Sequence, residues 1–339
     1  MRTLLAFAVT SLLASVASGA GTLDIYVVDT EGGKAVVLLT PEGETMLVDA
    51  GYPTEDDRDT KRIVEVAQGA GIKQFDYVVA THYDDDHSGN VARLDARLPG
   101  RVFVDHGDPI PTLNARSRSS NYEPYVKAIG DRKRMSVKPG DTIPLKGLRV
   151  TVVTAGGKAI SKPLPGGGQP NELAPASRPT YRDRDDNAGS VGLLYEFGKF
   201  RMLDLADLLS SVEYDLVCPR NLVGTVDLFM VSHHGLNVSN AKFLVHVLRP
   251  RVAIMNNGAR KGGTPETLDV LRGSPGLQDL WQLHYSVAGG QKNAPDDFIA
   301  NLEPVNCQGK WIKLSAGRNG SFTVTNSRNG FSKTYKPRK

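Results

Sequence analysis

Short apolar runs rich in β-branched residues alternate with turn residues along this chain, which is the pattern of β-strands joined by tight turns. Near the N-terminus the pattern predicts an antiparallel meander that ends at the sequence Asp49-Ala50-Gly51. The next apolar residues recur at helical spacing up to Gly71, so we expect a helix with one buried face that covers a sheet. The expected strands span 23–28, 35–40 and 45–49, and the expected helix spans 58–70.

A similar arrangement of an apolar strand and polar residues occurs twice, far apart in the chain. Before both His82 and His233, an Asp stands six positions ahead and a hydroxyl residue directly ahead. We therefore expect two similar halves, at about 21–155 and 186–290, that fold into two facing sheets. Chance similarity between two buried strands is the alternative. Further strands are expected at 190–197, 200–205, 226–231, 251–255, 280–285, 311–315 and 321–325, and helices at 241–248 and 265–272.

Two stretches differ from the regular pattern: one carries no usable periodicity, and the other ends in a charge run. Residues 156–186 are rich in Gly, Pro, Ser and charged residues, and so long an irregular segment is usually functional or mobile. The segment 300–339 is predicted to extend the domain with strands, and its basic last residues are predicted to be a solvated charge run.

Composition and the N-terminal residues indicate the compartment. Residues 1–20 combine Arg2, an apolar stretch and small residues, which is typical of a secretory signal peptide. We expect cleavage near residue 20, a secreted or periplasmic protein, and a single domain over 21–339 without an integral membrane segment; an uncleaved anchor is the alternative. The net charge of +4 does not by itself indicate nucleic-acid binding. Cys218 and Cys307 fit one disulfide or two free thiols equally well.

The segment from His82 to His87, directly after an apolar strand, carries the chemistry that organises the chain. It places two imidazoles and three carboxylates within six positions. Packing these groups together is costly without a cation, because like charges repel and a neutral imidazole needs a partner. Zinc and manganese accept this mixture of nitrogen and oxygen ligands, so we predict a metal site at the end of the strand. A solvated acidic loop with incidental histidines is the alternative.

The spacing His82-x-Asp84-x-Asp86-His87 resembles the metal-binding motif of the metallo-β-lactamase superfamily, whose usual form is His-x-His-x-Asp-His. Supporting features follow in the expected order along the chain: Asp49-x-Gly51, Asp207 at a strand end, and His233-His234-Gly235. An Asp at the second position together with Ser-His-His-Gly resembles the hydrolase domain of ComEC-type competence proteins and their secreted relatives. The resemblance implies an α/β fold, an αββα sandwich of two facing mixed sheets flanked by helices, with the metals at one edge.

The same resemblance implies two cations per chain. The second cation would take the ligands that follow the superfamily motif, whereas the first would be poorer in nitrogen. Asp84 stands where a histidine is usual, and a later histidine is missing, with Asp186 and Asn187 nearest its place. Harder ligands leave Mn²⁺ open beside Zn²⁺. The implied ligands are His82, Asp84, Asp207 and Asn187 for the first ion, and Asp86, His87, Asp207 and His234 for the second. We expect His234 to be a ligand and His233 to lie behind the ligands or face the substrate.

The expected reaction uses a metal-bound hydroxide. Two cations about 3.5–4 Å apart lower the pKa of a bridging water toward about 7 and polarise the bond under attack. The residues predicted to take part in catalysis are Asp86, His233 and Asp85, and Asp85 would steer the water. For Asp85, an exposed carboxylate without such a role is the alternative.

Loops beside the predicted site supply candidate substrate contacts. His106 and His284 each end a predicted strand and could face the site, and a structural hydrogen bond is the alternative for His106. Arg260 and Lys261 lie in a Gly-rich turn that offers backbone amides and two cations to a phosphate, or is a simple flexible turn.

The leading expectation is a secreted metal-dependent hydrolase of a phosphodiester, either a nucleic acid such as single-stranded DNA or another phospho-ester. It rests on the Asp variant of the motif and on cations in predicted loops, namely Arg116, Arg118, Arg132, Lys133, Arg134 and Arg260. One alternative keeps the metals and cleaves an acyl bond in a lactone or β-lactam, because the same hydroxide serves both reactions. The other is a non-catalytic binding protein with a degenerate metal site. The sequence does not determine the oligomeric state.

Overall fold

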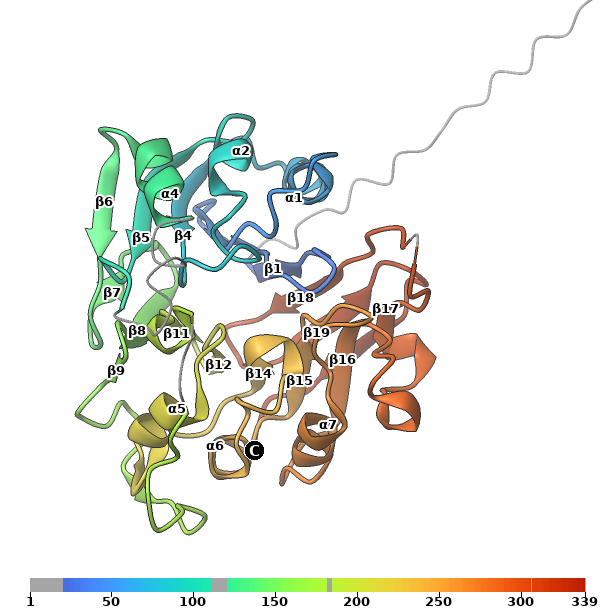
Figure 1. The fold of residues 1–339 in the computed structure, drawn as a ribbon. Helices are drawn as coiled ribbons and strands as arrows, with labels where there is room; N and C mark the ends of the chain where they lie inside the picture. The colour runs from blue at the N-terminus through green and yellow to red at the C-terminus, as the bar shows by residue number, and fades with distance from the viewer. Residues whose placement is uncertain (1–20, 111–120, 182–184, 306, 339) are drawn as a thin grey trace, which may run out of the picture.

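The computed structural model describes residues 21–110, 121–181, 185–305 and 307–338 (Figure 1). In these residues two nine-stranded sheets face each other, and helices cover the outer face of each sheet. The predicted α/β class and αββα sandwich are therefore confirmed. The expected signal peptide, 1–20, lies outside the described residues. Within the described residues, no helix combines the length and the apolar character needed to cross a membrane.

The first sheet contains strands from both ends of the chain. Its pairs are antiparallel from β20 to β3 and parallel from β3 to β6. In spatial order the strands are β20 (Ser332–Tyr335), β19 (Phe322–Asn326), β18 (Ile312–Ala316), β1 (Leu23–Val27), β2 (Val36–Leu39), β3 (Thr45–Val48), β4 (Phe75–Val79), β5 (Gly100–Asp105) and β6 (Lys133–Ser136).

The second sheet follows the same sequence of antiparallel and then parallel pairs. The pairs from β7 to β12 are antiparallel and those from β12 to β17 are parallel. In spatial order the strands are β17 (Ile299–Asn301), β16 (Asp279–His284), β15 (Val252–Met255), β14 (Leu228–Met230), β12 (Phe200–Asp204), β11 (Gly192–Phe197), β8 (Arg149–Ala155) and β7 (Thr142–Ile143); β9 (Lys158–Ala159) pairs with β8. A separate short pair is formed by β10 (Gln169–Pro170) and β13 (Arg220–Asn221).

Both faces of each sheet are buried, which explains why many strands are continuous apolar runs. In β2, Val36 and Leu38 face the core between the sheets, whereas Val37 faces the helix side. The first sheet is covered by α1 (Arg58–Gly69), α2 (Val91–Asp95) and α4 (Tyr122–Ile129), and the second by α5 (Ser210–Val217), α6 (Lys242–Leu248) and α7 (Pro265–Arg272). The 3-10 turns are η1 (Asn187–Gly189), η2 (Ser232–Gly235), η3 (Gly290–Lys292) and η4 (Asp296–Phe298).

The carboxyl ends of four strands deliver the polar residues singled out above. Asp49 follows β3, residues 82–87 follow β4, Asp207 follows β12, and His234 lies in the turn after β14. Strands in parallel register end at the same edge of their sheet, where ligands of open α/β sheets commonly bind. The fold therefore places these residues at one edge of the sandwich, between the two sheets.

The C-terminal end corrects the sequence analysis, which predicts no strand after residue 325. Lys336 and Arg338 are exposed, as predicted for the basic run, but β20 extends the first sheet. Tyr335 is buried, its ring stacks on Phe322 at 4.8 Å between centroids, and its hydroxyl donates to Asp279 and accepts from Trp281 Nε1. Strand alternation explains the difference, because it puts Tyr335 in the core while Lys333 stays partly exposed.

Replacing Phe322 by Ala should lower the free energy of unfolding by about 3–5 kcal/mol, because the ring packs between Phe200 and Tyr335 in the core. Urea denaturation followed by circular dichroism measures this change. The matched control is Thr323→Ala, which removes only a cross-strand hydroxyl contact to Thr334 and should cost under about 1 kcal/mol. Equal small costs would show that the C-terminal strands do not belong to the core.

Candidate metal centre

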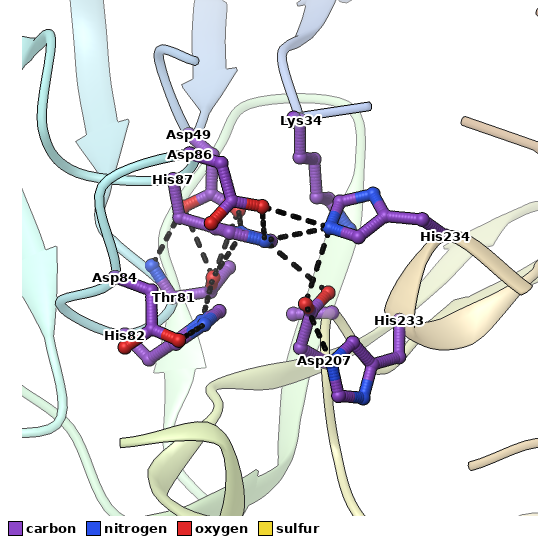
Figure 2. A network of polar contacts seen from close by, with 12 residues as sticks. Lys34, Asp49, Thr81, His82, Asp84, Asp86, His87, Asp207, His233 and His234 are labelled. Atoms are coloured by element: carbon purple, nitrogen blue, oxygen red, sulfur yellow. Dashed lines mark hydrogen bonds and ion pairs between the residues drawn. The ribbon is translucent and has the colours of Figure 1, made fainter. Parts of the chain in front are cut away.

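Four buried side chains from distant segments converge on one point: Asp86, His87, Asp207 and His234 (Figure 2). One ligand atom of each lies within 4.8 Å of those of the others. His234 Nε2 is 2.9 Å from Asp86 Oδ2 and 3.2 Å from Asp207 Oδ2. His87 Nε2 is 3.3 Å from Asp86 Oδ2 and 3.2 Å from Asp207 Oδ1. Two imidazole nitrogens and two carboxylates directed at one another form a donor set that suits a divalent cation.

Asp49 fixes the orientation of His87. Its Oδ2 lies 2.8 Å from His87 Nδ1, and its Oδ1 accepts hydrogen bonds from the backbone N–H and the hydroxyl of Thr81. A proton on Nδ1 directed at this carboxylate leaves the lone pair of Nε2 pointing into the group of four. Burial alone would raise the pKa of Asp49, but the charge and hydrogen bond of His87 outweigh it and hold the pKa below its ordinary value.

The turn that carries His234 is held by residues behind it. His233 and His234 have φ values of 51° and 53°, a left-handed conformation that costs energy in a non-glycine residue. Asn240 braces the turn, since its side chain accepts from Ser232 N–H and donates to the Ser232 carbonyl. Glu213 in turn accepts the backbone N–H of Asn240. The strained turn is therefore fixed by a buried network that starts in α5.

Two buried atoms of the other implied ligand set have no hydrogen-bond partner: His82 Nε2 and Asn187 Oδ1. Asp84 Oδ2 lies 3.6 Å from His82 Nε2, and the ring of His82 lies 4.1 Å from that of His87. An unsatisfied buried polar atom costs about 1–3 kcal/mol, so these two atoms suit a bound cation. The group of four, whose ligand atoms lie within 4.8 Å of one another, does not include His82, Asp84 or Asn187. Their assignment as ligands therefore stays a prediction.

The charges of the site are balanced by histidine protons and by Lys261. Burial raises the pKa of Asp86, but His87 and His234 outweigh it and hold the pKa well below its ordinary value. Burial lowers the pKa of His87, but Asp207, Asp86 and Asp49 outweigh it and raise the pKa well above its ordinary value. A cation bound here must therefore displace a proton from His87, and affinity falls in acid.

His233 and Asp85, both predicted to act in catalysis, lie outside the group of four. His233 Nε2 is 3.5 Å from Asp207 Oδ2, and its Nδ1 is 3.2 Å from Ser239 Oγ. Burial lowers the pKa of His233 to about 4, so its imidazole is neutral at pH 7. Asp85 is exposed, and its carboxylate accepts a hydrogen bond from Asn121.

The predicted substrate contacts lie in three different settings. His106 Nε2 is 2.8 Å from Asp186, whose carboxylate also accepts the N–H of Tyr83, so this histidine ties the loop before η1 to the metal-binding segment. His284 is buried in the wall of a cavity, and its Nε2 is 2.7 Å from Asp29. Lys261 reaches the group of four directly, because its Nζ lies 2.5 Å from Asp86 Oδ2.

The sequence analysis missed a lysine under the metal centre. Lys34 is 2% exposed, and its ammonium forms an ion pair with Asp204, which joins the first sheet to the second beside the site (Figure 2). Its backbone also contacts the motif, since Lys34 N–H donates to the carbonyl of Asp86. The only signal in the sequence was a charged residue directly before a buried apolar strand.

A second group of metal-ligating residue types, Asp29, His284 and Cys307, lies nearby. Arg62 already neutralises it, donating to Asp29 at 2.9 Å and to the sulfur of Cys307 at 3.3 Å. The group therefore forms an ion-pair network with its own cation. Cys218 and Cys307 are both free thiols in the structure.

Comparison with known proteins agrees with this fold. Residues 29–169 match the family model described as the metallo-beta-lactamase superfamily. The matched stretch contains Asp49 and the whole segment from His82 to His87. The protein thus has a metallo-β-lactamase fold, and the match supports its membership of that superfamily.

The individual relatives are distant. Coenzyme F420H(2) oxidase from Methanothermobacter marburgensis is 26% identical over 105 residues, which cover 31% of this chain and only 24% of the length of the oxidase. The metallo-beta-lactamase fold protein YhfI from Bacillus subtilis covers 77% of this chain and 96% of its own at 10% identity, with a TM-score of 0.47. CmlA, a diiron beta-hydroxylase from Streptomyces venezuelae, covers 70% and 45% at 18% identity, with a TM-score of 0.41.

Replacing Asp49 by Asn should weaken metal binding by about 10–100-fold, because an amide N–H₂ facing His87 Nδ1 moves the ring proton to Nε2 and removes the donor lone pair. Competition with a chromophoric chelator measures the dissociation constant. Asp85→Asn makes the same chemical change at an exposed position and should leave the affinity unchanged. Equal affinities for the two variants would contradict the orienting role of Asp49.

Glu213 should make stability fall as pH rises. Burial raises its pKa from the ordinary 4.5 to about 7, although the N–H groups of Ala241 and Asn240 oppose the shift. Between these values the folded chain keeps a proton that the unfolded chain has released, so the free energy of unfolding drops by about 3 kcal/mol. In urea denaturation across this range, wild type should lose that amount relative to Glu213→Gln. A constant difference would refute the assignment.

Proposed function

We propose that this protein is a metal-dependent hydrolase that cleaves a phosphodiester. The observation that carries the proposal is the convergence of Asp86, His87, Asp207 and His234 in a buried donor set with one imidazole oriented by a carboxylate. The match to the metallo-beta-lactamase superfamily model supports it. Divalent cations such as Zn²⁺ or Mn²⁺ supply activation of a water molecule and polarisation of the bond under attack.

The residues of the chain divide the work around that chemistry. His87 and His234 present nitrogen donors, and Asp207 belongs to both implied ligand sets, with His82, Asp84 and Asn187 as the proposed ligands of a further ion. His233, a neutral imidazole beside Asp207, is placed to hydrogen-bond a substrate or a departing group. Asp86 holds His234 and Lys261 together at the edge of the site.

The preference for a phosphodiester now rests on fewer cations than the sequence suggested. Arg132 and Arg134 form ion pairs with Asp95 and Asp105, so they hold the fold and are not available to a substrate. Arg116 and Arg118 lie outside the described residues. The remaining support is the oxygen-rich ligand set together with Lys261 and Arg260 in the loop after β15.

Metal-loaded protein should hydrolyse bis(p-nitrophenyl) phosphate, and a chelator should abolish turnover until Zn²⁺ or Mn²⁺ is restored. His87→Ala and Asp207→Ala should each lower kcat/KM by at least about 10³-fold, since they remove ligands and not substrate contacts. Absorbance of p-nitrophenolate follows the reaction. The matched control, Lys73→Gln, changes an exposed residue at the opposite end of β4 and should keep full activity.

Two further substrates decide between bond types. A chromogenic cephalosporin and a homoserine lactone test acyl hydrolysis, and turnover of these alone would replace the phosphodiester by an acyl substrate. Activity on single-stranded DNA should fall steeply with salt, because phosphate contacts release counterions. Stoichiometric metal without turnover of any substrate would favour a binding protein.

A further inference from the structure

A cavity of about 240 Å³ lies beside the metal centre, and Lys261 belongs to both. Arg260, His284 and Glu31 form other parts of its wall. Lys261 Nζ contacts Asp86 Oδ2 at 2.5 Å and the hydroxyl of Tyr52 at 3.1 Å, and its side chain is 35% exposed. A group bound in the cavity would therefore reach the same ammonium that touches a candidate metal ligand.

The loop that carries the two cations is fixed to the metal centre. Gly263 N–H donates to the carbonyl of His234 at 2.9 Å, and Thr264 N–H donates to the carbonyl of Gly235 at 3.0 Å. At Gly262, φ is 80°, and an added Cβ would lie 1.9 Å from the His234 carbonyl oxygen, so only glycine allows this approach. The positions of Arg260 and Lys261 are therefore set relative to His234 by the backbone.

Arg260 is the unpaired charge of the cavity. It is exposed, and among the described residues its guanidinium has no ion pair or hydrogen bond. The other charged arginines nearby are occupied, because Arg58 and Arg62 both pair with Glu31. An exposed guanidinium with five free donors is suited to bidentate contact with a phosphate.

The acidic groups around the cavity are paired with arginines. Glu31 contacts Arg58 and Arg62, and Asp29 behind His284 contacts Arg62. Burial and the nearby Asp29 raise the pKa of the Cys307 thiol to about 12, so it is neutral at pH 7. When Asp86 binds a cation, Lys261 also loses part of its counter-charge. The net field in the cavity is then positive and favours an anion.

We propose that this cavity binds a terminal phosphate of the substrate, adjacent to the phosphodiester that is cleaved, through Arg260 and Lys261. The inference rests on the proposed function for the bond that is broken. The volume is below the roughly 300–1,000 Å³ of pockets that enclose whole small ligands, so the cavity takes one end of a substrate. The proposal predicts that the protein cleaves short or end-phosphorylated nucleic-acid chains in preference to internal sites of long chains.

Two dinucleotides that differ only by a 5′-phosphate test this preference. The kcat/KM for pTpT should exceed that for TpT by about tenfold or more in the metal-loaded protein. Arg260→Gln should bring the ratio close to one, whereas Lys73→Gln, the loss of an exposed cation elsewhere, should preserve it. A ratio near one in wild type, or a ratio that survives Arg260→Gln, would overturn the proposal.

Binding without turnover separates this inference from the proposed function. Isothermal titration of metal-loaded protein with thymidine 5′-monophosphate should give saturable binding that Arg260→Gln weakens about tenfold, with thymidine as the uncharged probe. If the monophosphate binds in this way but neither dinucleotide is cleaved, the phosphate site is supported and the phosphodiesterase activity is contradicted. Absent binding, or binding insensitive to Arg260→Gln, contradicts the site. Thermal melting and metal content confirm that each variant is folded and loaded.

Discussion

Buried carboxylates that meet at the edge of two sheets are the constraint on which the site depends. Asp86, Asp207 and Asp49 are all removed from water, and their charges must be compensated by protons, by lysine or by a cation. The structure uses each kind of partner: His87 and His234 lie between the acids, Lys261 reaches Asp86, and Lys34 lies close by, paired with Asp204. A divalent ion would take over a role that the protein already fills with its own positive charges.

The motif at 82–87 and its resemblance to a known superfamily were sufficient to predict the fold class and the segments that reach the site. The resemblance implied Asp207 and His234 as ligands, and both follow strands that end at the same edge of a sheet. The contacts that brace these residues were not visible. Glu213 supports the His234 turn through Asn240, and Lys34 meets Asp204 across 170 positions of sequence. Such pairs depend on how distant segments pack, which periodicity does not encode.

The last strand, β20, shows a second limit of sequence reasoning. A run such as Ser332-Lys333-Thr334-Tyr335 has the composition of a solvated tail, and only its alternation indicates a strand with one apolar side. The arginines in predicted loops are a similar case. Arg132 and Arg134 look available in sequence, yet each pairs with a carboxylate that lies far from it along the chain. Whether a charged side chain can contact a substrate depends on its partners in the fold, and the sequence does not specify these partners.

The pairing of β1 with β18 has a consequence for how the molecule assembles. Val27 lies opposite Ile312, so one edge of the N-terminal meander has no partner until the chain has been made as far as β18. Such long-range pairing is slow to form because a large loop must close first. During synthesis β1 would therefore present an open, apolar strand edge, and the nascent chain would need a chaperone or rapid completion to avoid pairing with another copy.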